Sequence, residues 1–285
     1  MSPGRDTPSQ SRAKPAQQQK EEQQVERIEE RSTPRTPVIY EIVRRYGEDE
    51  MARPAVSLWW SGVAAGLSMS FSLLAQALLA MRLPESDWQR LVVALGYPVG
   101  FVMVVLARQQ LFTENTITVV LPVIAHPNGR NLWRGGRMWL IVLLANLAGT
   151  LLAALFSTYT PVVTPELREA MIAVSREAMQ YGWLEMAFRG VTAGFLMAAM
   201  VWLIPAAEGA QFYVIFLMSY LIALADAAHI VAGSVEAFML VANGELGIGA
   251  MLGGFTVPVL LGNIVGGTVL FAMLSYAQVM KEIER

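Results

Sequence analysis

Long apolar stretches beyond Arg53 constrain the fold of this chain more than any other feature. Twenty of the forty-four charged residues lie within residues 1–54, so the rest of the chain is poor in charge. A transmembrane helix needs roughly 20 mostly apolar residues. Four stretches meet that requirement: residues 55–81, 138–159, 190–205 with their flanks, and 251–278. A water-soluble surface could not hold so much apolar area, so the sequence predicts an all-α membrane protein.

Two further apolar stretches are too long for a single span and carry polar residues inside them. Residues 91–124 are interrupted at Arg108 and its polar neighbours, and residues 212–241 are interrupted at Asp226 and His229. A bilayer of ordinary thickness does not need so many residues. Each stretch is therefore interpreted as one broken helix, which gives six transmembrane helices with the second and fifth broken.

Short motifs recur in the same order in the two halves of the membrane region. Gly62-Val-Ala-Ala-Gly66 in the first span matches Gly190-Val-Thr-Ala-Gly194 in the fourth, and Asn146-Leu-Ala-Gly149 in the third matches Asn263-Ile-Val-Gly266 in the sixth. Small residues at this spacing are also common wherever membrane helices pack closely. The shared order and the matching places of the broken spans predict an inverted repeat of three plus three helices, with a substrate site near the midplane.

The distribution of charge predicts the domain boundaries and the orientation. Residues 1–36 are expected to be a disordered cytoplasmic tail, and residues 37–54 either a short amphipathic helix at the membrane surface or a continuing linker. Residues 55–278 are the six-helix channel domain, and residues 279–285 a cytoplasmic C-terminal end. With the N-terminus inside, fifteen Lys and Arg residues lie on the inner side and five on the outer side. Both termini are therefore expected in the cytoplasm.

Several classes of function find no support in the composition. The chain has no cysteine and only two histidines, so disulfides, thiol catalysis and a metal site are not expected. No basic stripe with interleaved aromatic residues is present, which argues against nucleic-acid binding. Neither a nucleophile–base pair nor a cofactor motif is visible, so we expect a protein that is not an enzyme and carries no cofactor.

Ionisable side chains gather at the two breaks. Backbone groups freed by an interrupted helix must be buried in protein or line a wet cavity, and ionisable residues at membrane depth are functional candidates. His229 is the only histidine within a predicted span, and it could give a hydrogen bond or a proton to a weak-acid anion near neutral pH. The other interpretation is a buried neutral histidine that backbone carbonyls satisfy.

The remaining polar residues near the breaks have two interpretations each. The Thr113 hydroxyl could bind an anion or cap freed amides, and Asn263 could orient His229 and the Thr113 loop or only pack between helices. Acidic side chains would repel an anion if they faced the pore, so they are expected to bind loop amides or Arg108. These acidic residues are Glu114, Asp226 and Glu236.

Three motifs in a fixed order resemble the signatures of the formate/nitrite transporter family. They are Leu111-Phe112-Thr113-Glu114-Asn115, His229 within the broken fifth span, and Gly262-Asn263-Ile-Val-Gly266-Gly267. The runs ARQQLFTENT (107–116) and AHIVAGSVE (228–236), with the long polar tail, are similar to the YfdC-like branch of that family. The resemblance covers about residues 55–277. It implies an aquaporin-like fold and a homopentamer in a bacterial inner membrane, with one pore in each protomer.

The resemblance also assigns the pore residues. The loop of Leu111, Phe112 and Thr113 would face the central donor His229 between two hydrophobic constrictions, with Asn263 as the hydrogen-bonding neighbour of the histidine. Phe101 and Ile222 would supply one constriction. The residues expected to support the loops are Glu114, Asn115 and Asp226.

Four positions depart from the family pattern. Ala228 and Ala178 stand where an acidic residue and a lysine are usual, and Gly194 and Gly233 stand where asparagines are usual. The scaffold is therefore expected, while the substrate stays open: a small monovalent weak-acid anion such as formate or nitrite, or its neutral acid. The alternatives are a pore for neutral solutes such as water or glycerol, and a membrane scaffold that transports nothing.

Overall fold

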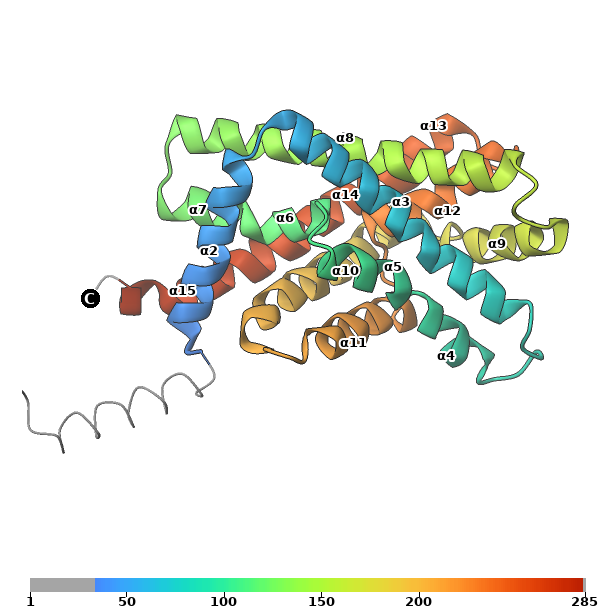
Figure 1. Ribbon diagram of the computed structural model, residues 1–285, viewed down its shortest axis with the longest axis horizontal. Coiled ribbons are helices and arrows are strands. Elements are labelled where there is room, and N and C mark those ends of the chain that lie inside the picture. Colours follow the sequence, from blue (N-terminus) through green and yellow to red (C-terminus); the bar gives the residue numbers. More distant parts are fainter. Residues whose placement is uncertain (1–33, 284–285) are drawn as a thin grey trace, which may run out of the picture. The chain divides into compact units, whose positions relative to one another are not determined.

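The computed structural model describes residues 34–283, and all regular structure among them is helical (Figure 1). Five helical stretches are long and apolar enough to cross a membrane. They are α3 (Ala55–Ala80), α4 to α5 (Gln89–Leu106), α8 (Gly129–Tyr159), α10 to η2 (Trp183–Ala206) and α13 to α15 (Ile248–Glu282). The prediction of an all-α chain with several membrane-crossing helices is confirmed. The predicted tail lies outside the described residues as far as residue 33.

Shorter helices complete the described part of the chain. They are α2 (Thr36–Ala52), α6 (Phe112–Thr118), α7 (Val120–Ala125), α9 (Pro165–Ala178), α11 (Gln211–Leu224) and α12 (Ile230–Ala242). Within the long stretches the elements are α4 (Gln89–Val93), η1 (Ala94–Gly96), α5 (Pro98–Leu106), α10 (Trp183–Leu203), η2 (Ile204–Ala206), α13 (Ile248–Ala250), η3 (Met251–Thr256), α14 (Val257–Ile264), η4 (Val265–Ala272) and α15 (Met273–Ile283). Both η3 and η4 are π-helical.

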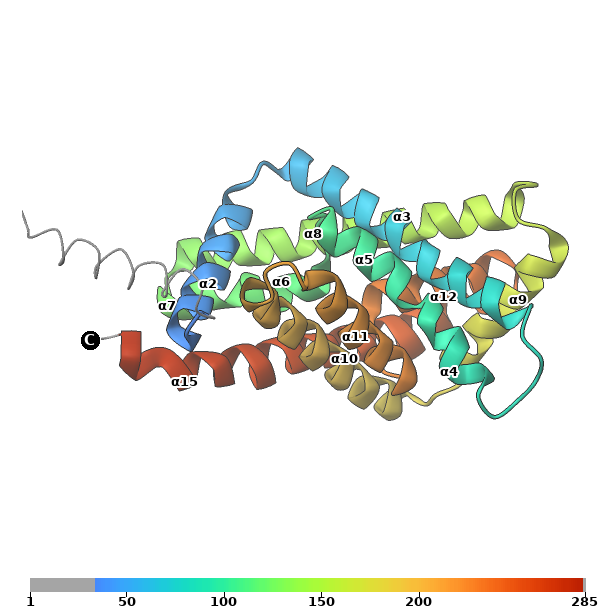
Figure 2. The same cartoon turned by 60° about the horizontal axis from the view of Figure 1, so that its bottom comes forward.

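Small residues bring the long helices close together. Helix α3 packs most extensively on α8, and α10 on α14, while α5 and α11 lie side by side (Figure 2). A Cβ on Gly66 would lie 2.3 Å from the carbonyl oxygen of Asn146, and a Cβ on Gly194 would lie 2.3 Å from that of Asn263. Backbones approach this closely only where a glycine faces them. The repeated Gly and Asn motifs of the sequence are therefore the contact surfaces of these two helix pairs.

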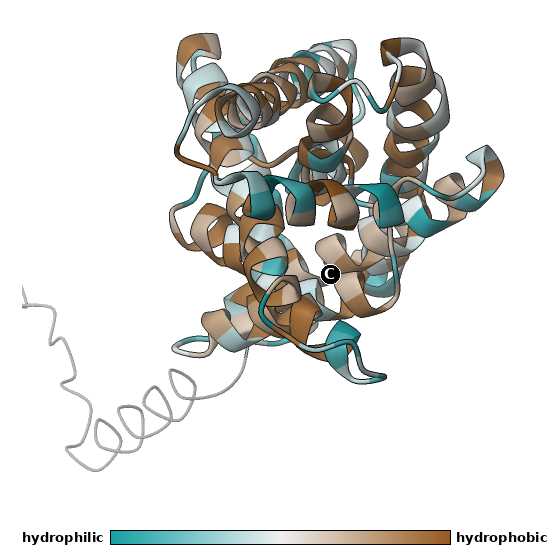
Figure 3. Cartoon of the chain, turned by 90° about the vertical axis from the view of Figure 1, so that its right-hand side faces the viewer, coloured by the Kyte–Doolittle hydropathy of each residue, from teal (hydrophilic) through white to brown (hydrophobic). Residues whose placement is uncertain are grey.

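Apolar side chains cover the outward faces of the long helices. Leu140, Phe188 and Leu274 are among the large apolar residues that lie exposed, and Figure 3 shows hydrophobic residues along most of the helices. A water-soluble protein rarely exposes so many large apolar groups together. These faces are suited to contact with lipid.

Both stretches that the sequence marks as interrupted contain a non-helical segment. Helix α5 ends at Leu106 and α6 begins at Phe112, and α11 ends at Leu224 and α12 begins at Ile230. In Figure 1, α6 and α12 run away from the middle of the helices in opposite directions. Each segment has one residue with positive φ, 52° at Arg108 and 48° at Asp226. A side chain in this conformation costs roughly 1–2 kcal/mol, so the surrounding contacts must hold it.

Helix α2 is anchored by protein contacts on one face. Its residues Tyr40, Val43 and Met51 are buried, and the helix packs on α6, α7 and α15. A Cβ on Gly47 would lie 1.7 Å from the carbonyl oxygen of Thr118, so α2 and α6 touch through their backbones. Residues Thr36–Ala52 are therefore helical, and the apolar face of this helix lies against neighbouring helices.

Candidate functional site

Thr113 and His229 meet at the ends of α6 and α12. The Thr113 Oγ1 and the His229 Nε2 are 2.7 Å apart, and both side chains are buried, with 0% and 1% exposure. Thr113 lies in the first turn of α6 and His229 is the residue before α12. The two breaks thus join a hydroxyl and an imidazole that are far apart in sequence.

Backbone contacts fix which nitrogen of His229 carries the proton. The Ala232 amide donates to the His229 Nδ1 over 3.1 Å, so this nitrogen must present its lone pair. In a neutral imidazole the proton then sits on Nε2, which donates it to the Thr113 Oγ1. The threonine hydroxyl keeps its own hydrogen for another acceptor. Protonating Nδ1 would break the bond to Ala232, so the site favours a neutral imidazole.

One asparagine braces each break from the helix beside it. Asn263 accepts from the Ile230 amide over 2.9 Å and donates to the Ala228 carbonyl over 2.9 Å. Its amide nitrogen also lies 2.8 Å from the Gly190 oxygen. It therefore holds the backbone on both sides of His229 and does not bond to the imidazole itself.

Asn146 does the same for the other break. It accepts from the Phe112 amide over 2.9 Å and donates to the carbonyls of Gln110 and Gly62 over 2.8 Å each. Each asparagine is fully buried and satisfies backbone groups that a broken helix leaves unpaired. Sequence reasoning placed Asn146 only in a packing motif. Its match with Asn263 in the repeat was the signal that it belongs to the site.

The predicted loop of Leu111, Phe112 and Thr113 is shorter than expected. Leu111 is extended, with φ −111° and ψ 125°, and Phe112 already begins α6. His229 has nearly the same backbone conformation before α12, with φ −106° and ψ 124°. Helix formation starts early because Asn146 caps the Phe112 amide, as Asn263 caps the Ile230 amide.

Apolar groups surround the Thr113–His229 pair. The ring of Phe101 lies edge-on to the imidazole with centroids 5.0 Å apart. Leu111, Phe112 and Ile222 are also buried, and Ile222 lines a cavity that reaches the histidine. The surroundings of the pair are therefore dry, which strengthens its hydrogen bond.

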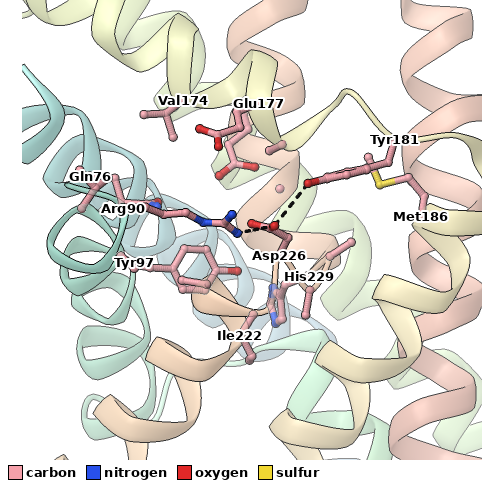
Figure 4. Close-up of a pocket in the computed structure, with 18 of the residues that line it drawn as sticks. Gln76, Arg90, Tyr97, Val174, Glu177, Tyr181, Met186, Ile222, Asp226 and His229 are labelled. Carbon is pink, nitrogen blue, oxygen red and sulfur yellow. Dashed lines mark hydrogen bonds and ion pairs between the residues drawn. The ribbon is translucent and has the colours of Figure 1, made fainter. Parts of the chain in front are cut away.

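One cavity is lined by Val174, Glu177 and Ala178 of α9 and reaches His229, and we call it the α9-side cavity. Its volume is about 130 Å³. Figure 4 shows Tyr97, Ile222 and His229 at one end of it and Glu177 at another. Glu236 also lines it. This last carboxylate was expected to bind loop amides or an arginine, and within residues 34–283 it makes neither kind of contact.

Asp226 links the break before α12 to α4 and α10. Its carboxylate pairs with Arg90 and accepts from the Tyr181 hydroxyl over 3.3 Å (Figure 4). It also lies 3.7 Å from the guanidinium of Arg189. Arg189 also donates to the Asp226 carbonyl over 2.9 Å. These contacts hold the positive φ of Asp226. The partners are these arginines and not Arg108, which lies over the ring of Tyr46.

A second cavity is lined by Ile42, Tyr46 and Glu50 of α2, and we call it the α2-side cavity. Its volume is about 480 Å³, and it reaches the residues directly before and after residues 111–113. Gln110 and Glu114 line it, whereas Leu111, Phe112 and Thr113 line neither cavity. These three buried side chains therefore lie between two residues that line the α2-side cavity, and Thr113 bonds to His229, which lines the α9-side cavity.

Two of the polar residues around this cavity support the break and one does not. Asn115 donates to the Gln110 side chain over 3.4 Å, and Gln110 in turn bonds to Glu50 of α2. The Glu114 Oε1 is buried with no hydrogen-bond partner among the described residues. Glu114 was expected to bind loop amides or Arg108, and instead it faces the cavity.

The structure accounts for two of the four departures from the family pattern. A Cβ on Gly194 would meet the backbone of Asn263 at 2.3 Å, so no asparagine fits there. A Cβ on Gly233 would meet the ring of Phe255 at 2.6 Å, so this ring occupies the space of a side chain. Ala178 lines the α9-side cavity beside Glu177.

No metal site is visible in the described part of the chain. Residues 34–283 contain no group of three or more His, Asp or Glu side chains that could hold a metal ion. The polar groups at the centre are one hydroxyl and one imidazole, which suit hydrogen bonding to a small solute.

This chain is similar to known proteins both in its sequence and in its fold. A family model described as Formate/nitrite transporter matches residues 37–277. The chain is 44% identical over 259 residues to the inner membrane protein YfdC of Escherichia coli (strain K12), covering 91% of this chain and 84% of that protein. Among solved structures, an FNT family ion channel has a TM-score of 0.73 at 19% identity, covering 84% of this chain and 98% of that one. A pentameric formate channel with formate bound has a TM-score of 0.68 at 18% identity, covering 79% and 98%.

Proposed function

The chain belongs to the formate/nitrite transporter family, and from this premise we propose that it is a membrane channel or transporter for a small monovalent weak-acid anion, such as formate or nitrite, or for its neutral acid. The membership in that family, which the sequence predicted by resemblance, is confirmed. One observation carries the proposal: a hydroxyl and an imidazole bond to each other between two cavities.

The central pair would work as a hydrogen-bond donor in an apolar constriction. Moving a bare anion through a dry, apolar site is very costly, so the ion must be neutralised or held by donors. The His229 Nε2–H and the Thr113 hydroxyl are two such donors. When a solute oxygen enters between them, each can donate its hydrogen to that oxygen. Because Nδ1 already accepts from Ala232, we assign His229 the role of hydrogen-bond donor, and the proton that neutralises the solute comes from water.

The matched breaks support an inverted repeat of three plus three helices. Gln109 donates to the Val104 carbonyl over 3.0 Å before α6, and Ala227 donates to the Ile222 carbonyl over 3.0 Å before α12. The two breaks also share an asparagine brace, Asn146 or Asn263, and a close glycine contact, at Gly66 or Gly194. These likenesses fit one supersecondary unit that occurs twice in opposite orientation. In this arrangement α6 with α7 and α12 each complete a broken span.

The orientation and assembly follow from the same proposal. The relative of known location is an inner membrane protein, and the chain has several membrane-crossing helices, which places it in a bacterial inner membrane as a multi-pass protein. The Lys and Arg distribution puts both termini in the cytoplasm, so the α9-side cavity faces outward. The pentameric formate channel supports a homopentamer with one pore in each protomer.

The test is the flux of candidate solutes into proteoliposomes. Formate, nitrite, acetate, lactate and hydrosulfide are each measured from pH 5 to pH 8, with His229→Phe and Thr113→Val as variants. Both variants should lower the flux of the true substrate at least 10-fold, because each removes one donor from the centre. Leu261→Ala on an exposed face of α14 serves as the control. If His229→Phe leaves every flux unchanged, the mechanism is wrong. Osmotic shrinkage with water and glycerol would reveal a neutral-solute pore.

A further inference from the structure

The α9-side cavity presents hydrogen-bond acceptors that have no partner. Glu236 is 8% exposed and faces the cavity from α12, and within residues 34–283 its carboxylate makes no hydrogen bond or ion pair. Gln76 lines the same cavity from α3, and its Oε1 is buried and unbonded in the described part of the chain. Buried polar groups are nearly always paired, so the unbonded Glu236 carboxylate and Gln76 Oε1 indicate a site for a ligand.

The cationic groups around the cavity and two of its donors, Tyr181 and His229, are already engaged, whereas the Tyr97 hydroxyl makes no hydrogen bond to another described residue. Arg90 pairs with Asp226, and Tyr181 donates to it (Figure 4). Arg189, which does not line the cavity, also pairs with Asp226. The His229 ring bonds through Nε2 to Thr113 and through Nδ1 to Ala232. None of the engaged groups is directed at Glu236.

The ionisable groups of the cavity that remain without an ion pair are both carboxyl groups. Glu177 lies at its exposed mouth and makes no ion pair with another described residue. Glu236 lines the same cavity, so the two groups would repel each other when both are ionised. A buried carboxylate is stable only when a proton or a cation offsets its charge. An anion would add to the repulsion and could only accept hydrogen bonds.

We propose that the α9-side cavity binds a small ammonium-type cation, ammonium or methylammonium, between Glu236, Gln76 and Glu177. Such a cation carries one positive charge and several N–H donors, which match acceptors that come from three different helices. Tyr97 and Phe255 also line the cavity, and aromatic faces attract cations of this kind. A cavity of about 130 Å³ is in keeping with so small a ligand.

The cation would lie on the path to the central pair. His229, Gly233 and Glu236 are spaced four and three residues apart, so they share one face of α12, and all three line the cavity. The bound charge would offset the carboxylates on the outer side of His229. This role goes beyond the proposed transport of an acid, because it concerns a second solute at a separate set of atoms.

The test is equilibrium binding of methylammonium to the purified full-length protein in lipid nanodiscs, followed by isothermal titration. The wild type should bind it saturably, and Glu236→Gln should weaken binding at least 10-fold because it removes the negative charge from the buried acceptor. Glu166→Gln is the matched control: Glu166 is an exposed residue of α9 that does not line the cavity, and binding should be unchanged.

A second variant keeps the proposal testable if Glu236→Gln folds poorly. Ala178→Lys would place a tethered ammonium group in the cavity that Ala178 already lines, so it should abolish methylammonium binding with every acceptor intact. Absence of saturable binding in the wild type, or equal affinity in the Ala178→Lys variant, would overturn the proposal. Equal affinity for Na⁺ would overturn the choice of an N–H cation. Binding is measured without flux, so the result stands even if the proposed transport fails.

Discussion

Replacing Asn263 by leucine removes the brace of the second break and keeps the number and branching of the side-chain heavy atoms. The change deletes three hydrogen bonds of 2.8–2.9 Å and strands the Ile230 amide and the Ala228 carbonyl, which flank His229. Hydrogen bonds between membrane helices are worth about 0.6 kcal/mol each, whereas a stranded buried group costs about 1–3 kcal/mol. We therefore expect the free energy of unfolding to fall by about 2 kcal/mol at the least and by about 6 kcal/mol at the most.

The assay is reversible unfolding in mixed micelles with increasing SDS, followed by circular dichroism. Asn146→Leu should lose a similar amount, because Asn146 makes the same three kinds of bond. The double variant should lose less than the two single losses together, since both braces hold the one contact between Thr113 and His229. Leu261→Ala, on an exposed face of α14, is the control. If Asn263→Leu is no less stable than this control, the bracing role is refuted.

Three further predictions concern close backbone contacts and the surface helix α2. Gly194→Ala should destabilise the protein by about 1–3 kcal/mol through overpacking. Gly136→Ala is the control: a Cβ at Gly136 meets nothing within 4 Å, so this change should stabilise the protein by up to about 1 kcal/mol. Thermal unfolding measures both differences. Gly47→Ala should push α2 off the backbone of α6, seen as faster trypsin cleavage in α2. The hydrogen bond from Arg44 lowers the pKa of Glu41 to about 2, so this pair stabilises α2 above about pH 4.5 and the effect disappears as the pH falls towards 2. Thermal unfolding between these two pH values, followed by circular dichroism, should show this loss, and Glu41→Gln should remove the contribution of the pair. Less than about 1 kcal/mol is at stake because the pair is partly exposed.

The helical membrane architecture could be predicted from the sequence because apolar length and glycine spacing act locally. The repeated motifs at Gly66 and Gly194 were recognisable, and each glycine does lie against the backbone of an asparagine-bearing helix. The meeting of Thr113 with His229 was also expected, but through the family resemblance. No local pattern shows that two residues more than a hundred positions apart lie 2.7 Å from each other.

Side-chain partners could not be predicted, because they depend on helices that are distant in sequence. Glu114 was expected to bond, yet its Oε1 is buried without a partner among the described residues. Asp226 was expected to support its loop through amides or Arg108, and it pairs with Arg90 and Arg189. Arginines so far along the chain become its neighbours only when α4 and α10 pack beside the break.

The two breaks share a backbone turn while differing in the side chain at its end. Leu111 and His229 occupy the same position before α6 and α12, with φ values of −111° and −106°. The backbone must be alike in both because each broken helix leaves the same groups to be satisfied, and one asparagine does so in each half. Side chains are free to differ, so the proposed repeat supplies one imidazole on one side and an apolar leucine on the other. A second histidine at Leu111 would place another polar ring among the buried apolar side chains. The donor pair therefore takes its hydroxyl from one half of the proposed repeat and its imidazole from the other.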